Sequence, residues 1–247
     1  MPGIVSVQET IEAALHKIFK TPVAINGCGR TDTGVHATQY FFHTDLPDFA
    51  HFDLRFRLNK VLPTDISVFD IFPFEGQPHA RFDCFHRTYD YFIHSSKDPF
   101  MTDSSALYEL EGLDFGAMAT AAKLLPLYND YKGFCRTPDK HEHHICRVSD
   151  SILYTNPDQT RLRFHIASNR YLKGMIRILV SKLLEIGQGS LAIEQFEQAL
   201  KTGIALPEAP TAYARGLYLS KVTYPYLDLP ARPAAVFNGE WVVVEAV

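Results

Sequence analysis

Hydrophobic residues recur at helical spacing in five stretches of this chain. In the first stretch, Ser6-Val7-Gln8-Glu9 has the pattern of a capping box, and apolar residues follow it at intervals of three and four positions. An amphipathic helix is therefore predicted over 6–20, ended by Pro22. The other helices are expected near 53–61, over 114–125, from Asn169 to Ile186 with Gly187 closing it, and around 192–201.

Strand patterns lie between the predicted helices. Short runs rich in β-branched and aromatic residues, bounded by glycine or proline, are typical of strands. Since helices and strands are mixed and a terminal hairpin is indicated at Asn238-Gly239, the sequence predicts an α+β protein with a largely antiparallel sheet. The strands are expected at 23–25, 38–43, 66–73, 81–93, 148–155, 160–167 and 217–223.

The helix expected from Asn169 to Ile186 carries two distinct faces. Arg170, Lys173 and Arg177 fall on one stripe, and Ser181 continues it one turn further on. Charge alone is equally consistent with a basic groove and with a solvated helix face. The core face is expected to consist of Leu172, Met175, Ile176, Leu179, Leu183 and Ile186.

The composition is that of an ordinary globular protein. Its 247 residues, 46% of them hydrophobic, are enough for a sizeable buried core. The formal net charge of -4 argues against a protein that coats nucleic acid through one broad basic surface. Residues 159–184, however, contain six basic residues and no acidic one, so a basic groove on an acidic body is compatible with the sequence.

Cysteine usage and hydropathy indicate the compartment. The four cysteines form no Cys-x-x-Cys pair, so we expect free thiols in a reducing cytoplasm rather than a disulfide framework. The chain does not open with a basic run followed by an apolar stretch, and no segment approaches the roughly 18 apolar residues that a membrane span needs. We therefore expect a cytoplasmic protein that makes no use of a membrane.

The most unusual local environment surrounds Asp32. This carboxylate lies in the glycine-bearing loop 27–34, where backbone can approach a ligand closely, and Arg30 favours its ionised form. An ionised aspartate close to a sugar or an electron-poor ring can act as a nucleophile. An Asx-turn, in which the carboxylate caps its own loop, accounts for the same residues equally well.

The nine residues Gly29-Arg30-Thr31-Asp32-Thr33-Gly34-Val35-His36-Ala37 resemble the signature of the tRNA pseudouridine synthase A family. Nine residues in register make this a specific resemblance. Further matching stretches extend it over nearly the whole chain, at 58–66, 79–82, 87–93, 169–177, 185–189, 209–210 and 216–219.

The resemblance implies an isomerase that converts uridine in tRNA into pseudouridine without cofactor or metal. Asp32 matches the catalytic nucleophile of the family, and Arg177 matches a residue that pairs with it. Arg30 matches a residue thought to help expel the base and occupy its place. Tyr89 matches a tyrosine that stacks on the flipped base and is a candidate for removing the C5 proton, although an ordinary phenol is a weak base. Taken without the resemblance, Tyr89 is expected in ordinary core packing.

Basic and aromatic residues outside this set are expected to contact tRNA, because they suit phosphate contact and base stacking. The tract 140–147 lies where the family has a variable loop that faces RNA. Its histidines and Cys146 imitate a zinc site, but their spacing matches no common finger, so we expect no metal. The residues expected at RNA, in addition to Tyr89, are His79, Arg81, Phe82, Arg136, Arg170 and Lys173.

The resemblance also implies the pseudouridine synthase fold, in which two ferredoxin-like halves share a mainly antiparallel sheet with helices on one side. We expect one half at 1–97, carrying the catalytic loop, and the other at 98–247, completing the cleft and the RNA-binding surface. Members of the family usually work as homodimers, and their targets are uridines 38 to 40 in the anticodon arm of tRNA.

The match falls short at the start of the chain. Family members usually open with a strand and a Tyr-Asp-Gly-Thr stretch, whereas this sequence begins just after that point. We therefore expect a trimmed start that leaves an open sheet edge. A tRNA-binding protein with little or no catalysis is the alternative that such a start favours. A metal-dependent hydrolase that uses the tract 141–146 is a second alternative, independent of the start.

Overall fold

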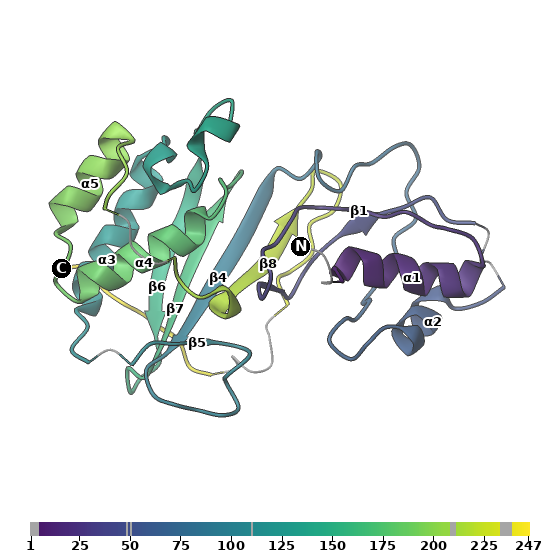
Figure 1. The fold of residues 1–247 in the computed structure, drawn as a ribbon, viewed down its shortest axis with the longest axis horizontal. Coiled ribbons are helices and arrows are strands. Elements are labelled where there is room, and N and C mark those ends of the chain that lie inside the picture. The colour runs from purple at the N-terminus through teal and green to yellow at the C-terminus, as the bar shows by residue number, and fades with distance from the viewer. Residues whose placement is uncertain (1–4, 48, 50, 110, 208–210, 233–238) are drawn as a thin grey trace. The chain divides into compact units, whose positions relative to one another are not determined.

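The chain folds into two compact units, drawn as ribbons in Figure 1. This computed structural model describes residues 5–47, 49, 51–109, 111–207, 211–232 and 239–247. The smaller unit comprises Met1–Arg30 and Phe41–Cys84, and the larger comprises Thr31–Tyr40 and Phe85–Val247. Asp32 thus belongs to the larger unit, whereas Arg30 belongs to the smaller one. The expected division at 97/98 concerns two halves of a shared sheet, and it stays a prediction.

The smaller unit packs two helices against a short hairpin-like pair of strands. Its elements are α1 (Val7–Phe19), β1 (Asn26–Gly27), β3 (Phe42–His43) and α2 (Leu54–Val61), with β1 and β3 antiparallel. The core of this unit is formed by buried residues of both helices and of the segment between α1 and β1. They are Ile11, Ala14, Leu15, Val23, Ile25, Leu54, Leu58 and Leu62.

Side-chain caps explain where these two helices begin. The Ser6 hydroxyl accepts a bond from the Glu9 amide, while the Glu9 carboxylate accepts one from the Ser6 amide, so the predicted capping box is confirmed. The Asp53 carboxylate accepts a bond from the Phe56 amide at the start of α2. The helices predicted over 6–20 and near 53–61 are therefore confirmed to within a residue at each end.

The larger unit is built on a seven-stranded sheet. Its strands run in the order β2-β8-β4-β7-β6-β9, and β5 pairs with β4 outside this path. Neighbouring strands are antiparallel except for β2 with β8 and β4 with β5, so the sheet is mixed. The strands are β2 (His36–Ala37), β4 (His86–His94), β5 (Ala106–Leu107), β6 (Val148–Thr155), β7 (Arg161–Ser168), β8 (Leu217–Thr223) and β9 (Val242–Val243).

Helices cover one face of this sheet and supply most of the core (Figure 1). The buried residues include Leu179 and Leu183 of one helix, Phe196 of another, and Phe164 and Ile166 of β7. The helices are α3 (Phe115–Leu124), α4 (Met175–Gly187) and α5 (Ile193–Thr202), with short 3-10 turns η1 (Leu125–Leu127), η2 (Lys132–Phe134), η3 (Pro138–Lys140) and η4 (Ala214–Gly216). An α+β fold is therefore confirmed, while the two ferredoxin-like halves stay a prediction.

Several predicted strands differ from the structure. Residues 66–73 form no strand, and residues 23–25 and 38–41 lie outside the strands that flank them. The long strand predicted over 81–93 begins only at His86, because the preceding segment turns, with the Asp83 amide donating to the His79 carbonyl. The strands predicted near 148–155, 160–167 and 217–223 are confirmed. The turn predicted at Asn238-Gly239 lies partly outside the described residues.

The prediction of a helix from Asn169 is wrong at its start. Gly174 has a left-handed φ of 75°, and α4 begins only after it, at Met175. Arg170 and Lys173 therefore precede the helix and share no helical stripe with Arg177. The predicted core face is nevertheless buried throughout, because Leu172 also packs into the core from the segment before the helix. Gly187 is the last residue of α4 rather than a residue beyond it.

The four cysteines, Cys28, Cys84, Cys135 and Cys146, are not joined in disulfides. Among the residues that the structure describes, no helix is both long and apolar enough to cross a bilayer.

Gly216 is held in a space that admits no side chain. A Cβ at this position would lie 2.7 Å from the Phe92 carbonyl oxygen and 2.7 Å from Cζ of Tyr91. We expect Gly216→Ala to lower the free energy of unfolding by about 1–3 kcal/mol through overpacking, measured by urea denaturation. Gly239→Ala is the matched control, since the nearest atom to its Cβ is 4.0 Å away. Equal unfolding midpoints for the two variants would contradict the prediction.

Candidate active site

The Asp32 loop is anchored by the strand that follows it. In β2, His36 and Ala37 pair in parallel with Tyr218 and Leu219 of β8. Within the loop, the Val35 amide donates to the Asp32 carbonyl oxygen at 3.1 Å. Gly34 has a φ of 80°, a left-handed conformation that favours glycine. The tight turn leaves the Asp32 side chain 46% exposed.

Arg177 pairs with this carboxylate from the first turn of α4. Its Nη1 donates to Oδ2 of Asp32 at 3.0 Å, and the arginine side chain is only 16% exposed. Within the described part of the chain, the Asp32 carboxylate is thus bonded to a distant arginine and not to amides of its own loop. The Asx-turn that the sequence left open is not formed.

The same guanidinium also holds the segment before η4. Arg177 Nε donates to the Ala212 carbonyl at 2.6 Å, and Nη2 lies 3.4 Å from the Thr211 hydroxyl. The Ala212 amide donates back to the Arg177 carbonyl at 3.1 Å. Because all three nitrogens of the guanidinium are bonded, its orientation towards Asp32 is fixed.

Two tyrosines, the buried Tyr91 and the half-buried Tyr108, fix the next residue of that segment. The Tyr91 hydroxyl donates to the Tyr213 carbonyl at 2.7 Å, and the Tyr213 amide donates to the Tyr108 hydroxyl at 3.1 Å. Burial raises the pKa of Tyr91, with further contributions from Tyr108, and it also raises the pKa of Tyr108. Both phenols therefore stay protonated at neutral pH and act as structural hydrogen-bonding groups.

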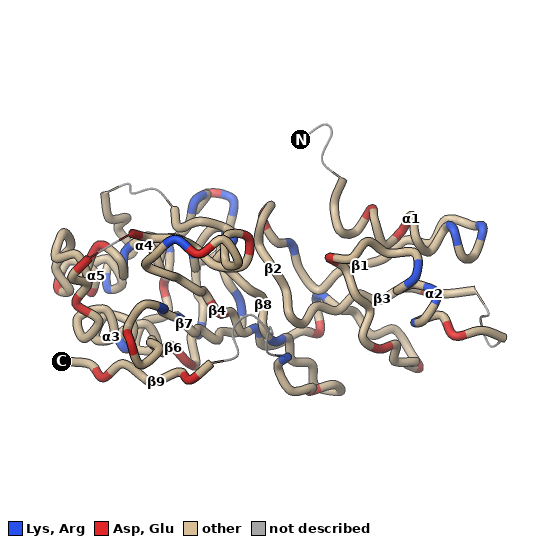
Figure 2. Tube along the Cα trace, turned by 90° about the horizontal axis from the view of Figure 1, so that it is seen from below, with Lys and Arg blue, Asp and Glu red and all other residues tan. Residues whose placement is uncertain are grey.

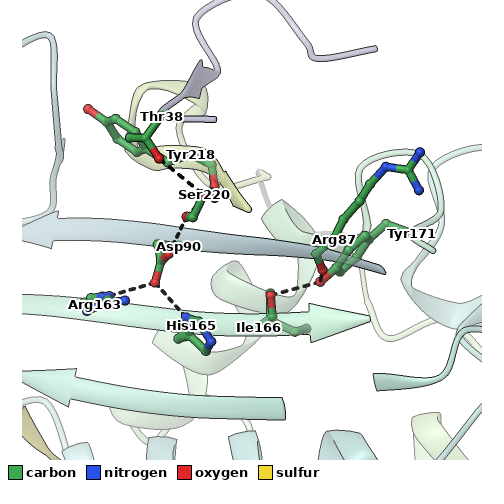
Figure 3. Close-up of polar contacts among 9 residues, drawn as sticks. All are labelled: Thr38, Arg87, Asp90, Arg163, His165, Ile166, Tyr171, Tyr218 and Ser220. Atoms are coloured by element: carbon green, nitrogen blue, oxygen red, sulfur yellow. Dashed lines mark hydrogen bonds and ion pairs between the residues drawn. The ribbon is translucent and has the colours of Figure 1, made fainter. Parts of the chain in front are cut away.

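Tyr89 lies on β4 with its ring fixed against another tyrosine. The ring of Tyr171 contacts it edge to face, with centroids 5.0 Å apart and planes at 81°. The Tyr171 hydroxyl lies 3.1 Å from the Arg87 carbonyl and 3.0 Å from the Ile166 carbonyl, so it contacts both β4 and β7 (Figure 3). Burial raises the pKa of Tyr171 well above its usual value. The partner of Tyr89 is thus a rigid, uncharged ring.

Strand register relates Tyr89 to the loop strand. Tyr89 is opposite Leu219 of β8, and Leu219 is opposite Ala37 of β2, so the three residues form one row across three strands. Residues opposite one another share a face of a sheet, and Tyr89 packs against the helix-covered core. Tyr89 therefore projects from the face that α4 and Arg177 occupy.

The remaining predicted catalytic residue, Arg30, is exposed and is the last residue of the first segment of the smaller unit.

Three predicted RNA-binding residues form a cluster in the smaller unit. His79 Nδ1 accepts bonds from the amides of Arg81 and Phe82, and its ring lies 4.2 Å from the Phe82 ring. The Arg81 guanidinium is 5.8 Å from the centre of the Phe82 ring, and Phe82 is 75% exposed. This surface offers an aromatic face with a cation, as base stacking requires.

The predicted RNA-binding residues of the larger unit gather before α4. The Arg136 amide donates to the Lys173 carbonyl at 3.0 Å, and the aliphatic part of Arg136 covers Gly174. Arg170 Nη1 lies 2.8 Å from Nε2 of His143. The tract 140–147 thereby contacts this basic segment. Among the described residues, no three His, Cys, Asp or Glu side chains gather as metal ligands would.

Sequence reasoning missed a buried carboxylate next to Tyr89. Asp90 is only 4% exposed, and its carboxylate accepts bonds from Arg163 Nε at 2.7 Å, from His165 Nδ1 at 2.9 Å and from the Ser220 hydroxyl (Figure 3). Burial alone would raise the pKa of Asp90, but the bond from His165, the charges of His165 and Arg163 and the Ser220 hydroxyl lower it overall. The signal that could have revealed it is a lone carboxylate inside the aromatic strand 87–93.

Charge is distributed evenly over the rest of the protein. Figure 2 shows Lys and Arg segments interspersed with Asp and Glu segments along both units. This agrees with the net charge of -4 and leaves local clusters, rather than one broad surface, to contact a polyanion.

The fold and the site together define a class of protein. It is an α+β protein in which a glycine-bearing loop presents a half-exposed, arginine-paired aspartate, an arrangement suited to nucleophilic chemistry. The sequence model of the family described as tRNA pseudouridine synthase matches residues 121–225.

Relatives extend this match to most of the chain. A tRNA pseudouridine synthase A of Porphyromonas gingivalis is 37% identical over 91% of this chain and 90% of its own length. The corresponding proteins of Parabacteroides distasonis and Streptococcus mutans are 37% and 31% identical, over 91% and 90% of this chain and 88% and 91% of their own lengths. The chain therefore belongs to the tRNA pseudouridine synthase A family, and it is an isomerase.

The lowered pKa of Asp90 makes a prediction about stability. Asp90→Asn removes a charged acceptor of three hydrogen bonds and should cost about 2–3 kcal/mol of unfolding free energy at pH 7. Because the folded-state pKa is below the unfolded value of about 3.9, this contribution is present above that pH and is lost as the pH falls through the folded-state value.

Urea denaturation of both proteins at pH 7, 5 and 3 measures the difference. We expect it to be largest at pH 7 and 5 and to shrink towards pH 3. A difference independent of pH would show that the Asp90 charge does not stabilise the fold.

Proposed function

We propose that this chain converts uridine to pseudouridine at positions 38, 39 and 40 in the anticodon stem-loop of tRNA, with Asp32 as the nucleophile. The observation that supports this most directly is the Arg177–Asp32 pair, at 3.0 Å, because it joins α4 to the aspartate of the loop that carries the family signature. A guanidinium held by three hydrogen bonds orients the carboxylate, as nucleophilic attack requires.

The overall change is balanced without a further reactant. The N1–C1′ bond breaks, a C5–C1′ bond forms, and one hydrogen leaves C5 while another joins N1. The uridine must first leave its stack, which costs a few kcal/mol and least at a loop or stem end. An anticodon stem-loop offers such nucleotides.

Tyr89 and Arg30 complete the proposed catalytic set. Tyr89 is half-buried on the face that carries Arg177, and its ring is held by Tyr171, so it offers a rigid surface for the flipped base. In this proposal Tyr89 also takes part in removing the C5 proton, and Arg30, which is exposed, occupies the place that the base leaves.

The basic residues before α4 and the cluster in the smaller unit are proposed to bind the tRNA. Arg136, Arg170 and Lys173 contact phosphates, and the exposed Phe82 ring with His79 and Arg81 stacks on a base. We extend the proposal to a homodimer in the cytoplasm, as the resemblance implies. The alternative, a tRNA-binding protein without catalysis, predicts binding without product.

Tritium release from tRNA labelled at uridine C5 tests the reaction. We expect the parent chain to release tritium and Asp32→Ala to release none, because the nucleophile is lost while the fold is kept. Asp70→Ala, which removes an exposed aspartate, is the control and should match the parent. Binding of tRNA by the parent without any release would favour the alternative.

The proposed RNA-binding residues make a separate prediction about salt. Arg170→Ala and Lys173→Ala should each weaken tRNA binding and reduce the slope of log K against log salt by about 0.7–0.9, one phosphate contact each. Lys123→Ala, an exposed lysine of α3, is the control and should keep the parent slope. Filter binding between about 50 and 200 mM salt measures the effect. An unchanged slope for both variants would place the tRNA elsewhere.

A further inference from the structure

Asp90 lies next to Tyr89 on β4 and points to the opposite face of the sheet, because side chains alternate along a strand. It is a buried carboxylate for which the proposed reaction has no use. A buried charge is costly unless it is fully bonded, so its three bonds need a structural reason.

The bonds of Asp90 join three neighbouring strands. Arg163 and His165 come from β7 on one side, and Ser220 comes from β8 on the other (Figure 3). In the β4–β8 register Thr88 is opposite Lys221 and Tyr89 is opposite Leu219, so the register passes over Ser220. Ser220 is therefore the extra residue of a β-bulge, and Asp90 bonds to it directly.

This bulge directly follows the row of residues that contains Tyr89 and Ala37. Leu219, next to Ser220, is opposite Tyr89 on one side and Ala37 of the loop strand on the other. The amides of Thr38 and Gln39 both donate to the Leu219 carbonyl, at 3.0 and 3.4 Å. A shift of β8 at the bulge would move the strand that carries the Asp32 loop relative to Tyr89.

Contacts on the same face extend the connection to β2. The His36 ring stacks on the Tyr218 ring, with centroids 4.6 Å apart. His36 Nε2 contacts the Asp103 carbonyl at 2.8 Å, and the Tyr218 hydroxyl donates to the Ser104 carbonyl at 2.6 Å. The consecutive carbonyls of Asp103 and Ser104 thus bond His36 of β2 and Tyr218 of β8, on the face of the sheet where Asp90 lies.

We propose that Asp90 is a positioning residue for the isomerisation: by bonding to the bulge residue Ser220 and to β7, it fixes Tyr89 relative to the β8–β2 pair that carries the Asp32 loop. This inference rests on the proposed roles of Asp32 and Tyr89. Asp90 acts from behind the sheet and contacts no substrate. Its loss should slow the chemical step while tRNA binding, which depends on other residues, stays unchanged.

The test separates rate from affinity. Single-turnover tritium release at saturating enzyme gives the rate, and filter binding gives the Kd for tRNA. We expect Asp90→Asn to slow the rate by about tenfold or more, because small misplacements of reacting groups are costly, with Kd within about twofold of the parent. Ser220→Ala, which removes the bond to Asp90 together with a longer contact to the Tyr218 carbonyl at 3.4 Å, should slow it by about threefold, part of the same positioning effect.

Ser151→Ala is the matched control. Ser151 is also a buried strand serine, but its hydroxyl has no hydrogen-bond partner among the described residues. It should keep the parent rate. The double variant Asp90→Asn/Ser220→Ala should be no slower than Asp90→Asn alone, since the two groups share one bond.

All rates are compared at a temperature where circular dichroism shows each variant folded, and Ser220→Ala carries the test if Asp90→Asn does not fold. Parent rates for the folded variants, or a loss confined to Kd, would overturn the inference. Asp32→Ala is measured alongside. If it is inactive while the Asp90 and Ser220 variants match the parent, only this inference fails, whereas release by Asp32→Ala would remove the proposed function and this inference with it.

Discussion

The arrangement of the site depends on one guanidinium. Arg177 projects from the first turn of α4, and its nitrogens contact Asp32, Thr211 and Ala212, which come from segments far apart in the chain. Because Arg177 is mostly buried, it needs these partners to offset the loss of water. The requirement to satisfy this cation fixes the loop, the helix and the segment before η4 in one arrangement.

Arg177 can contact Asp32 because of the position at which α4 starts. Gly174 adopts a left-handed conformation that the aliphatic part of Arg136 covers, and the helix begins immediately afterwards. Arg177 is thereby placed in the first turn. The residues before it, including Arg170 and Lys173, follow a non-helical path and present their charges independently of the helix. One glycine thus separates the residue that pairs with Asp32 from those proposed to bind RNA.

The central strand β4 directs side chains to both faces of the sheet. Tyr89 and Tyr91 point into the helix-covered core, where one is held by Tyr171 and the other bonds to Tyr213. Asp90 points the other way and bonds to β7 and β8. Alternation along a strand makes this division unavoidable, so Tyr89, a proposed catalytic group, lies on one face and its neighbour Asp90 on the other.

The sequence alone determined the helices, the strands near 148–155, 160–167 and 217–223, the core face of α4 and the family, because helical spacing, strand alternation and the nine-residue loop are local patterns. It also predicted a strand over 66–73 that the structure does not form. It could not place the start of α4, since the left-handed Gly174 depends on its packing against Arg136. It also gave no account of Asp90. Its bonds to Arg163, His165 and Ser220 join residues 73 to 130 positions apart, and only the strand order and the bulge in β8 bring them together.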